Sequence, residues 1–95
     1  ACTQQPGERL MGVQGPMAAD ALGVTLVHEH ILVDFIGADS IRPGRYHRDS
    51  VIKKALPHLL ALRKKGCRSL FECTPAYLGR DPLLLRELSE RSGLH

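Results

Sequence analysis

The sequence predicts an α/β fold, specifically a closed TIM (β/α)8 barrel, of which these 95 residues hold the N-terminal hairpin and the first two βα units. Strand-like and helix-like stretches alternate, and each helix-like stretch is long enough to connect two parallel strands. Neither strand-like stretch could cover its own edges and faces, so more units and a chain that continues beyond His95 are expected. An open doubly wound sheet is the alternative, but the Gly-rich turn of a dinucleotide-binding sheet does not follow the first strand, which favours the barrel.

The N-terminal residues are polar and interrupted by glycine and proline. We expect residues 1–9 to form a flexible tail and residues 10–95 to form the N-terminal portion of one barrel domain. Residues 10–17 contain a short extended run with two glycines and a proline, which indicates a small hairpin, and residues 20–23 are typical of a turn.

The first long strand is expected at residues 24–33. This stretch is rich in branched apolar side chains and nearly free of helix signals, which is typical of a parallel strand buried on both faces. Residues 34–48 are polar and contain Gly37, Pro43 and Gly44, so they predict a long loop. Long loops after strands commonly carry function.

A helix is expected next, because apolar residues recur at helical spacing from Val51 to Leu62. Asp49 or Ser50 is its expected N-cap, and Gly66 follows its expected end. Pro57 removes one backbone hydrogen bond inside this pattern, so we expect it to kink or split the helix.

Residues 67–74 predict the second strand, with Cys67 and Cys73 as small core residues. The second helix is expected to be capped by Asp81, to open at Pro82 and to end at Gly93.

The formal net charge of +3 comes from basic residues in one loop and along the first helix. A basic stripe can bind nucleic acid, but this region has Tyr46 as its single aromatic residue and no nucleic-acid-binding motif, so a solvated helix face is favoured and no nucleic-acid partner is expected. The three cysteines form neither a C-x-x-C pair nor a disulfide framework.

The first residues could carry a localisation signal. Ala1 and Cys2 with the polar residues after them resemble the mature start of a bacterial lipoprotein, in which the cysteine carries the lipid. That reading predicts a periplasmic or membrane-anchored protein. A disordered or artificial terminus is the alternative, and it leaves a cytoplasmic location.

Two histidines carry the most specific chemistry. Side chains two apart on a strand point to the same side, with α-carbons roughly 6.6–6.8 Å apart, so His28 and His30 can converge on one metal ion. Histidines on a strand can equally be polar core or surface residues, but a position near the end of a buried strand, before a long loop, favours a metal site. Glu29 and Glu72 are candidates for orienting a ligand; Glu29 could instead form a buried ion pair with an arginine, and Glu72 could face substrate.

Residues 23–31, Gly-Val-Thr-Leu-Val-His-Glu-His-Ile, resemble the signature of the phosphotriesterase family of the amidohydrolase superfamily, G-x-T-L-x-H-E-H followed by an aliphatic residue. Residues 13–17 and 79–81 resemble two further segments of that family in the same order. Together the three segments span most of the chain from about residue 10 onwards.

This resemblance implies a metal-dependent hydrolase with two divalent ions, commonly Zn²⁺, bridged by a carboxylated lysine and a hydroxide. His28 and His30 would bind the more buried ion. The resemblance implies that a lysine, two histidines and an aspartate from later strands complete the site. The lysines of this chain all lie on the expected first helix, so none of them is the bridging lysine. The substrate would be a small lactone, carboxylic ester, amide or phosphotriester, and a homodimer is expected.

Two other classes of function remain open at this point. The chain could belong to a protein of the same fold that binds small molecules without catalysis, or be an inactive fragment. It could also be a small basic binding module that is complete at 95 residues.

Overall fold

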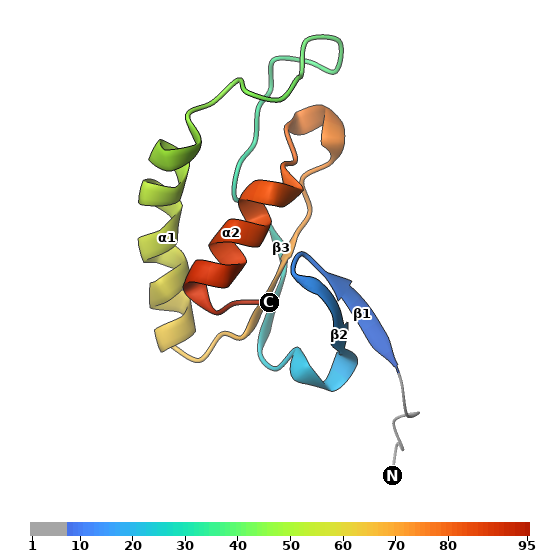
Figure 1. Ribbon diagram of the computed structural model, residues 1–95, viewed down its shortest axis with the longest axis vertical. Coiled ribbons are helices and arrows are strands. Elements are labelled where there is room, and N and C mark those ends of the chain that lie inside the picture. The colour runs from blue at the N-terminus through green and yellow to red at the C-terminus, as the bar shows by residue number, and fades with distance from the viewer. Residues whose placement is uncertain (1–7) are drawn as a thin grey trace.

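The computed structural model describes residues 8–95 (Figure 1). Arg9, which the sequence placed in the tail, is already the first residue of a strand. The described elements, in chain order, are β1 (Arg9–Gly12), β2 (Gly15–Ala18), the 3-10 turn η1 (Ala19–Ala21), β3 (Thr25–Glu29), α1 (Arg48–Lys64), β4 (Ser69–Glu72), the 3-10 turn η2 (Ala76–Leu78) and α2 (Pro82–Ser92).

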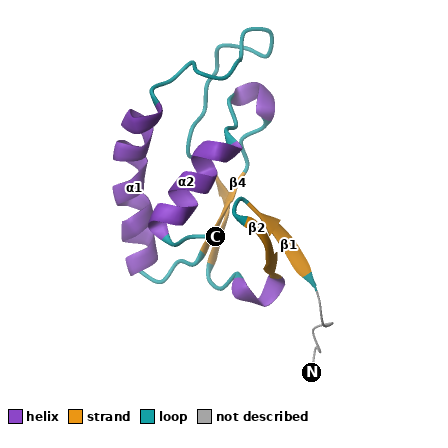
Figure 2. Cartoon of the chain, viewed as in Figure 1, coloured by secondary structure: helices purple, strands orange, loops and turns teal. Residues whose placement is uncertain are grey.

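The strands form two separate pairs (Figure 2). β1 and β2 make the predicted antiparallel hairpin, and β3 pairs with β4 in parallel, with α1 as the connection. The α/β order of the prediction is therefore confirmed. Both parallel strands are shorter than predicted, and their register shifts between Leu26 and Glu29, where β3 contains one residue more than β4. Val27 and His28 of β3 thus lie opposite Phe71 alone, so the irregularity includes the first of the two histidines.

α1 differs from the prediction at two points. It begins at Arg48 and is capped by His47, whose side chain accepts from the Ser50 amide, so neither Asp49 nor Ser50 is the N-cap. The helix also runs continuously through Pro57 to Lys64. Pro57 lies on the exposed side of α1, where water can satisfy the carbonyl that loses its backbone partner, and this explains why the helix is not split.

α2 begins and ends as predicted. The Asp81 side chain accepts from the amides of Leu83 and Leu84, and Pro82 occupies the first turn, where its missing amide proton costs nothing. Gly93 ends the helix in the left-handed conformation, with φ of 79°.

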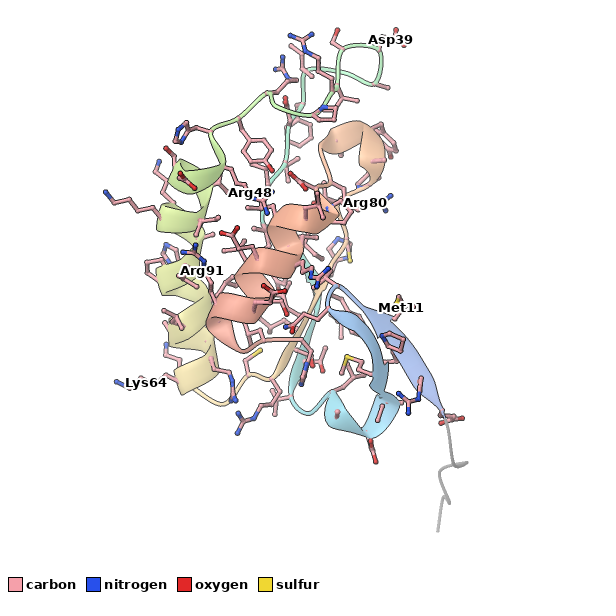
Figure 3. The ribbon with its side chains drawn as sticks, in the orientation of Figure 1. Met11, Asp39, Arg48, Lys64, Arg80 and Arg91 are labelled. Atoms are coloured by element: carbon pink, nitrogen blue, oxygen red, sulfur yellow. The ribbon has the colours of Figure 1, made fainter. Side chains whose placement is uncertain are left out.

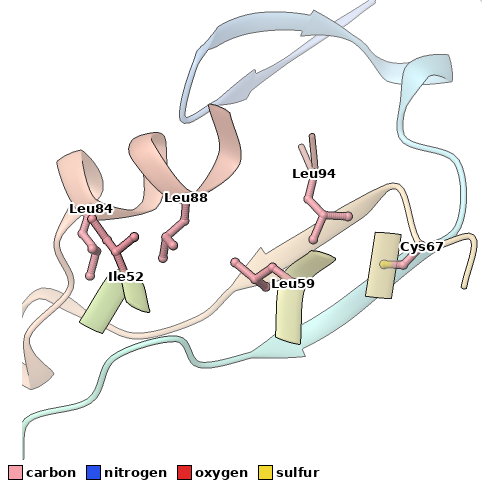
Figure 4. Close-up of a cluster of buried hydrophobic side chains, with 6 residues drawn as sticks. All are labelled: Ile52, Leu59, Cys67, Leu84, Leu88 and Leu94. Atoms are coloured by element: carbon pink, nitrogen blue, oxygen red, sulfur yellow. The ribbon is translucent and has the colours of Figure 1, made fainter. Parts of the chain in front are cut away.

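The hydrophobic core lies between the two helices and the β3–β4 pair (Figure 4). Leu26 of β3 and Leu70 of β4 pack against it, so both helices cover the same face of the strands. Its buried members are Ile52 and Leu59 from α1, Leu84 and Leu88 from α2, and Cys67 and Leu94.

The opposite face of the β3–β4 pair is open, which corrects the prediction of a strand buried on both faces. Val27 of β3 is 66% exposed, and Phe71 of β4 is 43% exposed. Cys73 is also exposed, so it is not the core residue that the sequence predicted, whereas Cys67 is buried. The physical reason is the placement of the helices, since α1 and α2 both lie on the Leu26 and Leu70 side of the strands.

The basic residues of α1 form a solvated face, as predicted. Lys53, Lys54 and Lys64 are exposed, and Figure 3 shows Lys64 pointing away from the end of the helix. Arg48 is different, because its guanidinium donates to the Leu83 carbonyl at 2.8 Å and lies 3.5 Å from a Glu87 oxygen. Arg48 therefore joins the first turns of the two helices.

The β1–β2 hairpin packs beside α2 (Figure 1), where the Gln14 side-chain amide donates to the Ser89 hydroxyl at 2.7 Å. Among residues 8–95, no helix has the length and apolar composition that crossing a membrane requires.

Candidate metal centre

The carboxyl ends of β3 and β4 lie at one edge of the parallel pair, and the long segments that leave them extend to the same end of the molecule (Figure 1). His28 is in β3, and His30 follows its last residue. Glu72 is the last residue of β4, and Thr74 lies two positions beyond it. The Cys73 amide donates to the Glu29 carbonyl at 2.8 Å, so the two chain segments remain paired at this edge.

The rings of His28 and His30 are neighbours. Their centroids lie 5.2 Å apart, with an angle of 68° between the ring planes. Both residues are exposed, on an edge that the helices leave open. The structure therefore brings together the two side chains that the H-x-H spacing singled out, and both residues remain exposed.

His30 is held by the segment that follows β4. Its Nδ1 lies 2.8 Å from the Thr74 hydroxyl oxygen and 3.9 Å from Oε1 of Glu72. The same Glu72 oxygen accepts from the Thr74 amide at 2.6 Å. His30, Glu72 and Thr74 thus form one cluster, in which Thr74 is 1% exposed and the Glu72 side chain 7%.

Thr74 is the site residue that sequence reasoning missed. A threonine two positions after a strand carries no metal-binding signature, and its partner lies 44 residues away. The available signal was its place just beyond the carboxyl end of a predicted parallel strand, where functional groups of a barrel gather.

Glu29 does not join this cluster through its side chain. Its backbone pairs with Glu72 across the strands, but within residues 8–95 its carboxylate makes neither a hydrogen bond nor an ion pair. A role in orienting a ligand, or a partner arginine, stays a prediction for Glu29.

The loops beside the histidines are fastened to one another. The Asp34 amide donates to the Leu78 carbonyl at 2.7 Å, and Arg45 donates to the Asp34 carboxylate at 2.6 Å. This hydrogen bond from Arg45 holds the pKa of Asp34 below its ordinary value of 3.8. Gly79 permits the close approach, because it has φ of 95° and an added Cβ would lie 3.1 Å from Cβ of Asp34.

The donor chemistry fits part of a metal site. Two accessible imidazoles are good ligands for a borderline-soft divalent ion, and a protein normally supplies three or four ligands. Within residues 8–95, no group of three or more His, Cys, Asp or Glu residues could hold a metal ion. The two imidazoles of His28 and His30 alone are thus fewer than the three or four ligands that a protein normally supplies.

Solved structures resemble this chain closely. An enzyme engineered for organophosphate hydrolysis from a weak promiscuous lactonase template is 32% identical with a TM-score of 0.80, and the match covers 92% of this chain and 27% of that one. A double mutant of the organophosphorus hydrolase from Deinococcus radiodurans is 34% identical with a TM-score of 0.75, covering 86% of this chain and 25% of that one. A single mutant of the same hydrolase has 34% identity and a TM-score of 0.76 over the same shares.

This chain therefore spans about a quarter of the length of these structures. A sequence model of the phosphotriesterase family matches residues 8–95. The family match and the structural matches agree over nearly all of the described residues, and homologues in this family are metal-dependent hydrolases. The chain belongs to the phosphotriesterase family.

Proposed function

We propose that this chain carries part of the active site of a metal-dependent hydrolase, in which His28 and His30 are metal ligands. The observation that carries the proposal is the pair of neighbouring, accessible imidazole rings, 5.2 Å apart at the carboxyl edge of β3. Family membership and the similarity to organophosphate-hydrolysing enzymes support hydrolysis as the reaction.

We infer that the β3–β4 pair belongs to a TIM barrel. The His95 amide donates to the Arg68 carbonyl at 2.9 Å, and the Leu70 amide donates to the His95 carbonyl at 2.9 Å. His95 thus bonds to the residues on either side of Ser69. This is the hydrogen-bond pattern of a parallel ladder, with His95 paired with Ser69. This pattern supports a third parallel strand beside β4, with α2 as the connection.

The open face of the strands fits the same architecture. Val27 and Phe71 are large apolar side chains on the face opposite the helices. In a barrel this face points inward, where branched and bulky side chains from all strands fill the interior. In a complete barrel, side chains from the other strands would cover Val27 and Phe71. The exposure of these two residues therefore fits a position inside a barrel.

In the proposed enzyme, His28 and His30 act as neutral imidazole ligands and not as acid or base. A divalent ion held by His28 and His30 together with further ligands would lower the pKa of a coordinated water and polarise the oxygen under attack. We propose zinc as the metal, because imidazole nitrogen is among its preferred ligands. The substrate class that we propose is a small lactone, carboxylic ester, amide or phosphotriester.

The test is the metal content of the full-length protein, measured by plasma mass spectrometry beside hydrolysis of a lactone and a phosphotriester. We expect about two zinc ions per chain in the unaltered protein. His28→Ala and His30→Ala should each lose at least one ion and most of the turnover. His58→Ala is the matched control, because His58 is an exposed histidine on α1. Unaltered zinc stoichiometry in both site variants would refute the ligand assignment.

Two further expectations stay predictions. Cys2 lies outside the described residues, and lipid attachment there, with the periplasmic or membrane-anchored location that it implies, is testable by the intact mass of protein purified from membranes. A homodimer is testable by sedimentation of the full-length protein.

A further inference from the structure

We propose that Thr74 is a positioning residue for His30, and that Glu72 fixes both of them. The inference rests on the proposed function, because it concerns how one of the two proposed metal ligands is oriented. It assigns a role to a side chain that comes from the segment after β4, 44 residues from the histidine that it contacts.

The first step is the burial of the hydroxyl group. Thr74 is 1% exposed, and Nδ1 of His30 is the partner of its Oγ1 at 2.8 Å. Water cannot readily replace a partner at such depth, so this hydrogen bond is retained while the segment remains folded. The bond fixes one nitrogen of the His30 ring and with it the direction of the other.

The second step is the direction of the hydrogen bond. Oε1 of Glu72 accepts from the Thr74 amide at 2.6 Å and lies 3.9 Å from Nδ1 of His30. A carboxylate on this side of the ring favours the tautomer with its hydrogen on Nδ1. Nδ1 of His30 then donates to the Thr74 hydroxyl, and the Nε2 lone pair is free on the side of the ring away from Thr74.

The third step is the contrast with His28. The His28 ring lies beside His30, with centroids 5.2 Å apart, but within residues 8–95 its side chain makes no hydrogen bond to the segment after β4. Of the two rings, His30 is therefore the one that the segment after β4 holds. A hydrogen bond to the far nitrogen of a histidine is the usual way in which proteins orient a metal ligand.

The decisive comparison is between two variants of the full-length protein. Thr74→Val keeps the shape of the side chain and removes the hydroxyl, whereas Thr74→Ser keeps the hydroxyl. Nitrogen-15 NMR of the metal-free protein reports which nitrogen of His30 carries the hydrogen, and competition with a chelator reports zinc affinity. We expect Thr74→Val to lose the Nδ1–H tautomer of His30 and to bind zinc about 10–100-fold more weakly than the unaltered protein. Thr74→Ser should retain the tautomer and the zinc affinity of the unaltered protein.

Two further variants separate positioning from general damage. Thr25→Val also removes a threonine hydroxyl bond, the one from Oγ1 to the Gly23 carbonyl at 2.9 Å, and it should change neither readout. Glu72→Gln can still accept from the Thr74 amide but lacks the charge, so it should shift the tautomer and weaken zinc binding by a smaller factor. If Thr74→Val does not fold, the Glu72→Gln comparison decides the matter.

The outcomes distinguish this inference from the proposed function. Zinc binding by the unaltered protein together with an unchanged His30 tautomer in folded Thr74→Val, or in Glu72→Gln if only that variant folds, would overturn the positioning role alone. Failure of the unaltered protein to bind zinc would refute the proposed function, and the tautomer of His30 in the same variants would still decide whether Thr74 orients the ring.

Discussion

The phenol of Tyr46 donates a hydrogen bond to Oδ2 of Asp81, which ties the residue two positions before α1 to the N-cap of α2. Burial and this hydrogen bond raise the pKa of Tyr46 to about 12. Burial acts to raise the pKa of Asp81, but the hydrogen bonds from Tyr46 and from the amides of Leu84 and Leu83 outweigh it, so the pKa lies below 3.8. Together with the contacts of Arg48 to Leu83 and Glu87, this hydrogen bond joins the starts of the two helices.

Removing the Tyr46 hydroxyl should destabilise the fold and change its response to alkali. We expect Tyr46→Phe to lower the free energy of unfolding by about 1 kcal/mol. Because the folded-state pKa lies above the ordinary value of 10.0, this stabilisation is complete below pH 10 and is lost as the pH rises towards 12. Urea unfolding followed by circular dichroism across this range measures both effects. Tyr77→Phe is the control, since Tyr77 is 56% exposed; an equal alkaline loss in Tyr46→Phe and the unaltered protein would contradict the assignment.

Asp81 should contribute stability through its side-chain cap. Asp81→Ala removes the acceptor for the Leu83 and Leu84 amides, and we expect a loss of about 1 kcal/mol, whereas Asp81→Asn keeps an acceptor and should lose less. The depressed pKa means that the ionised group stabilises the fold above pH 3.8, and this is lost as the pH falls through the lower folded-state value. Denaturant melts between neutral pH and pH 2 measure this slope. The idea fails if the alanine and asparagine variants are equally stable.

His47 should be replaceable by a better cap. Its Nδ1 accepts from the Ser50 amide at 3.3 Å, a long hydrogen bond, so His47→Ala should cost only about 0.5 kcal/mol. We expect His47→Asn to match or exceed the stability of the unaltered protein, because asparagine is among the preferred N-caps. Thermal unfolding compares the two with His58→Ala, an exposed change within α1. A stability ranking with His47→Ala above His47→Asn would rule out the cap.

Gly79 and Gly44 allow backbone strain to be separated from the packing of the two loops. Both have positive φ, 95° and 84°, so either Gly→Ala change should cost about 1–2 kcal/mol from the left-handed backbone. An added Cβ at Gly44 meets no described atom within 4 Å, whereas at Gly79 it would lie 3.1 Å from Cβ of Asp34. Gly79→Ala should therefore cost about 1 kcal/mol more than Gly44→Ala in equilibrium unfolding. Equal losses of stability in the two variants would show that Gly79 and Asp34 are not in close contact.

Local signals in the sequence predicted much of the fold. Asp81, Pro82 and Gly93 marked the bounds of α2 correctly, because caps and stops depend on hydrogen bonds within one turn. The alternation of strands and helices indicated the parallel β3–β4 pair with α1 between them. The alternation of side chains along a strand placed His28 and His30 on one side, where their rings are neighbours.

The remaining features depend on contacts between distant segments. The placement of α1 and α2 on the Leu26 and Leu70 side of the strands left Val27 and Cys73 exposed. Pairing of β3 with β4 brought Thr74 to within 2.8 Å of His30, which no spacing within either segment encodes.

The sequence by itself thus determined the neighbouring placement of the two imidazoles and the order of the elements, because both follow from backbone periodicity and from bonds between near neighbours. The orientation of His30 was decided by tertiary structure alone, since Thr74 and Glu72 reach the ring only after two strands distant in the chain align in parallel.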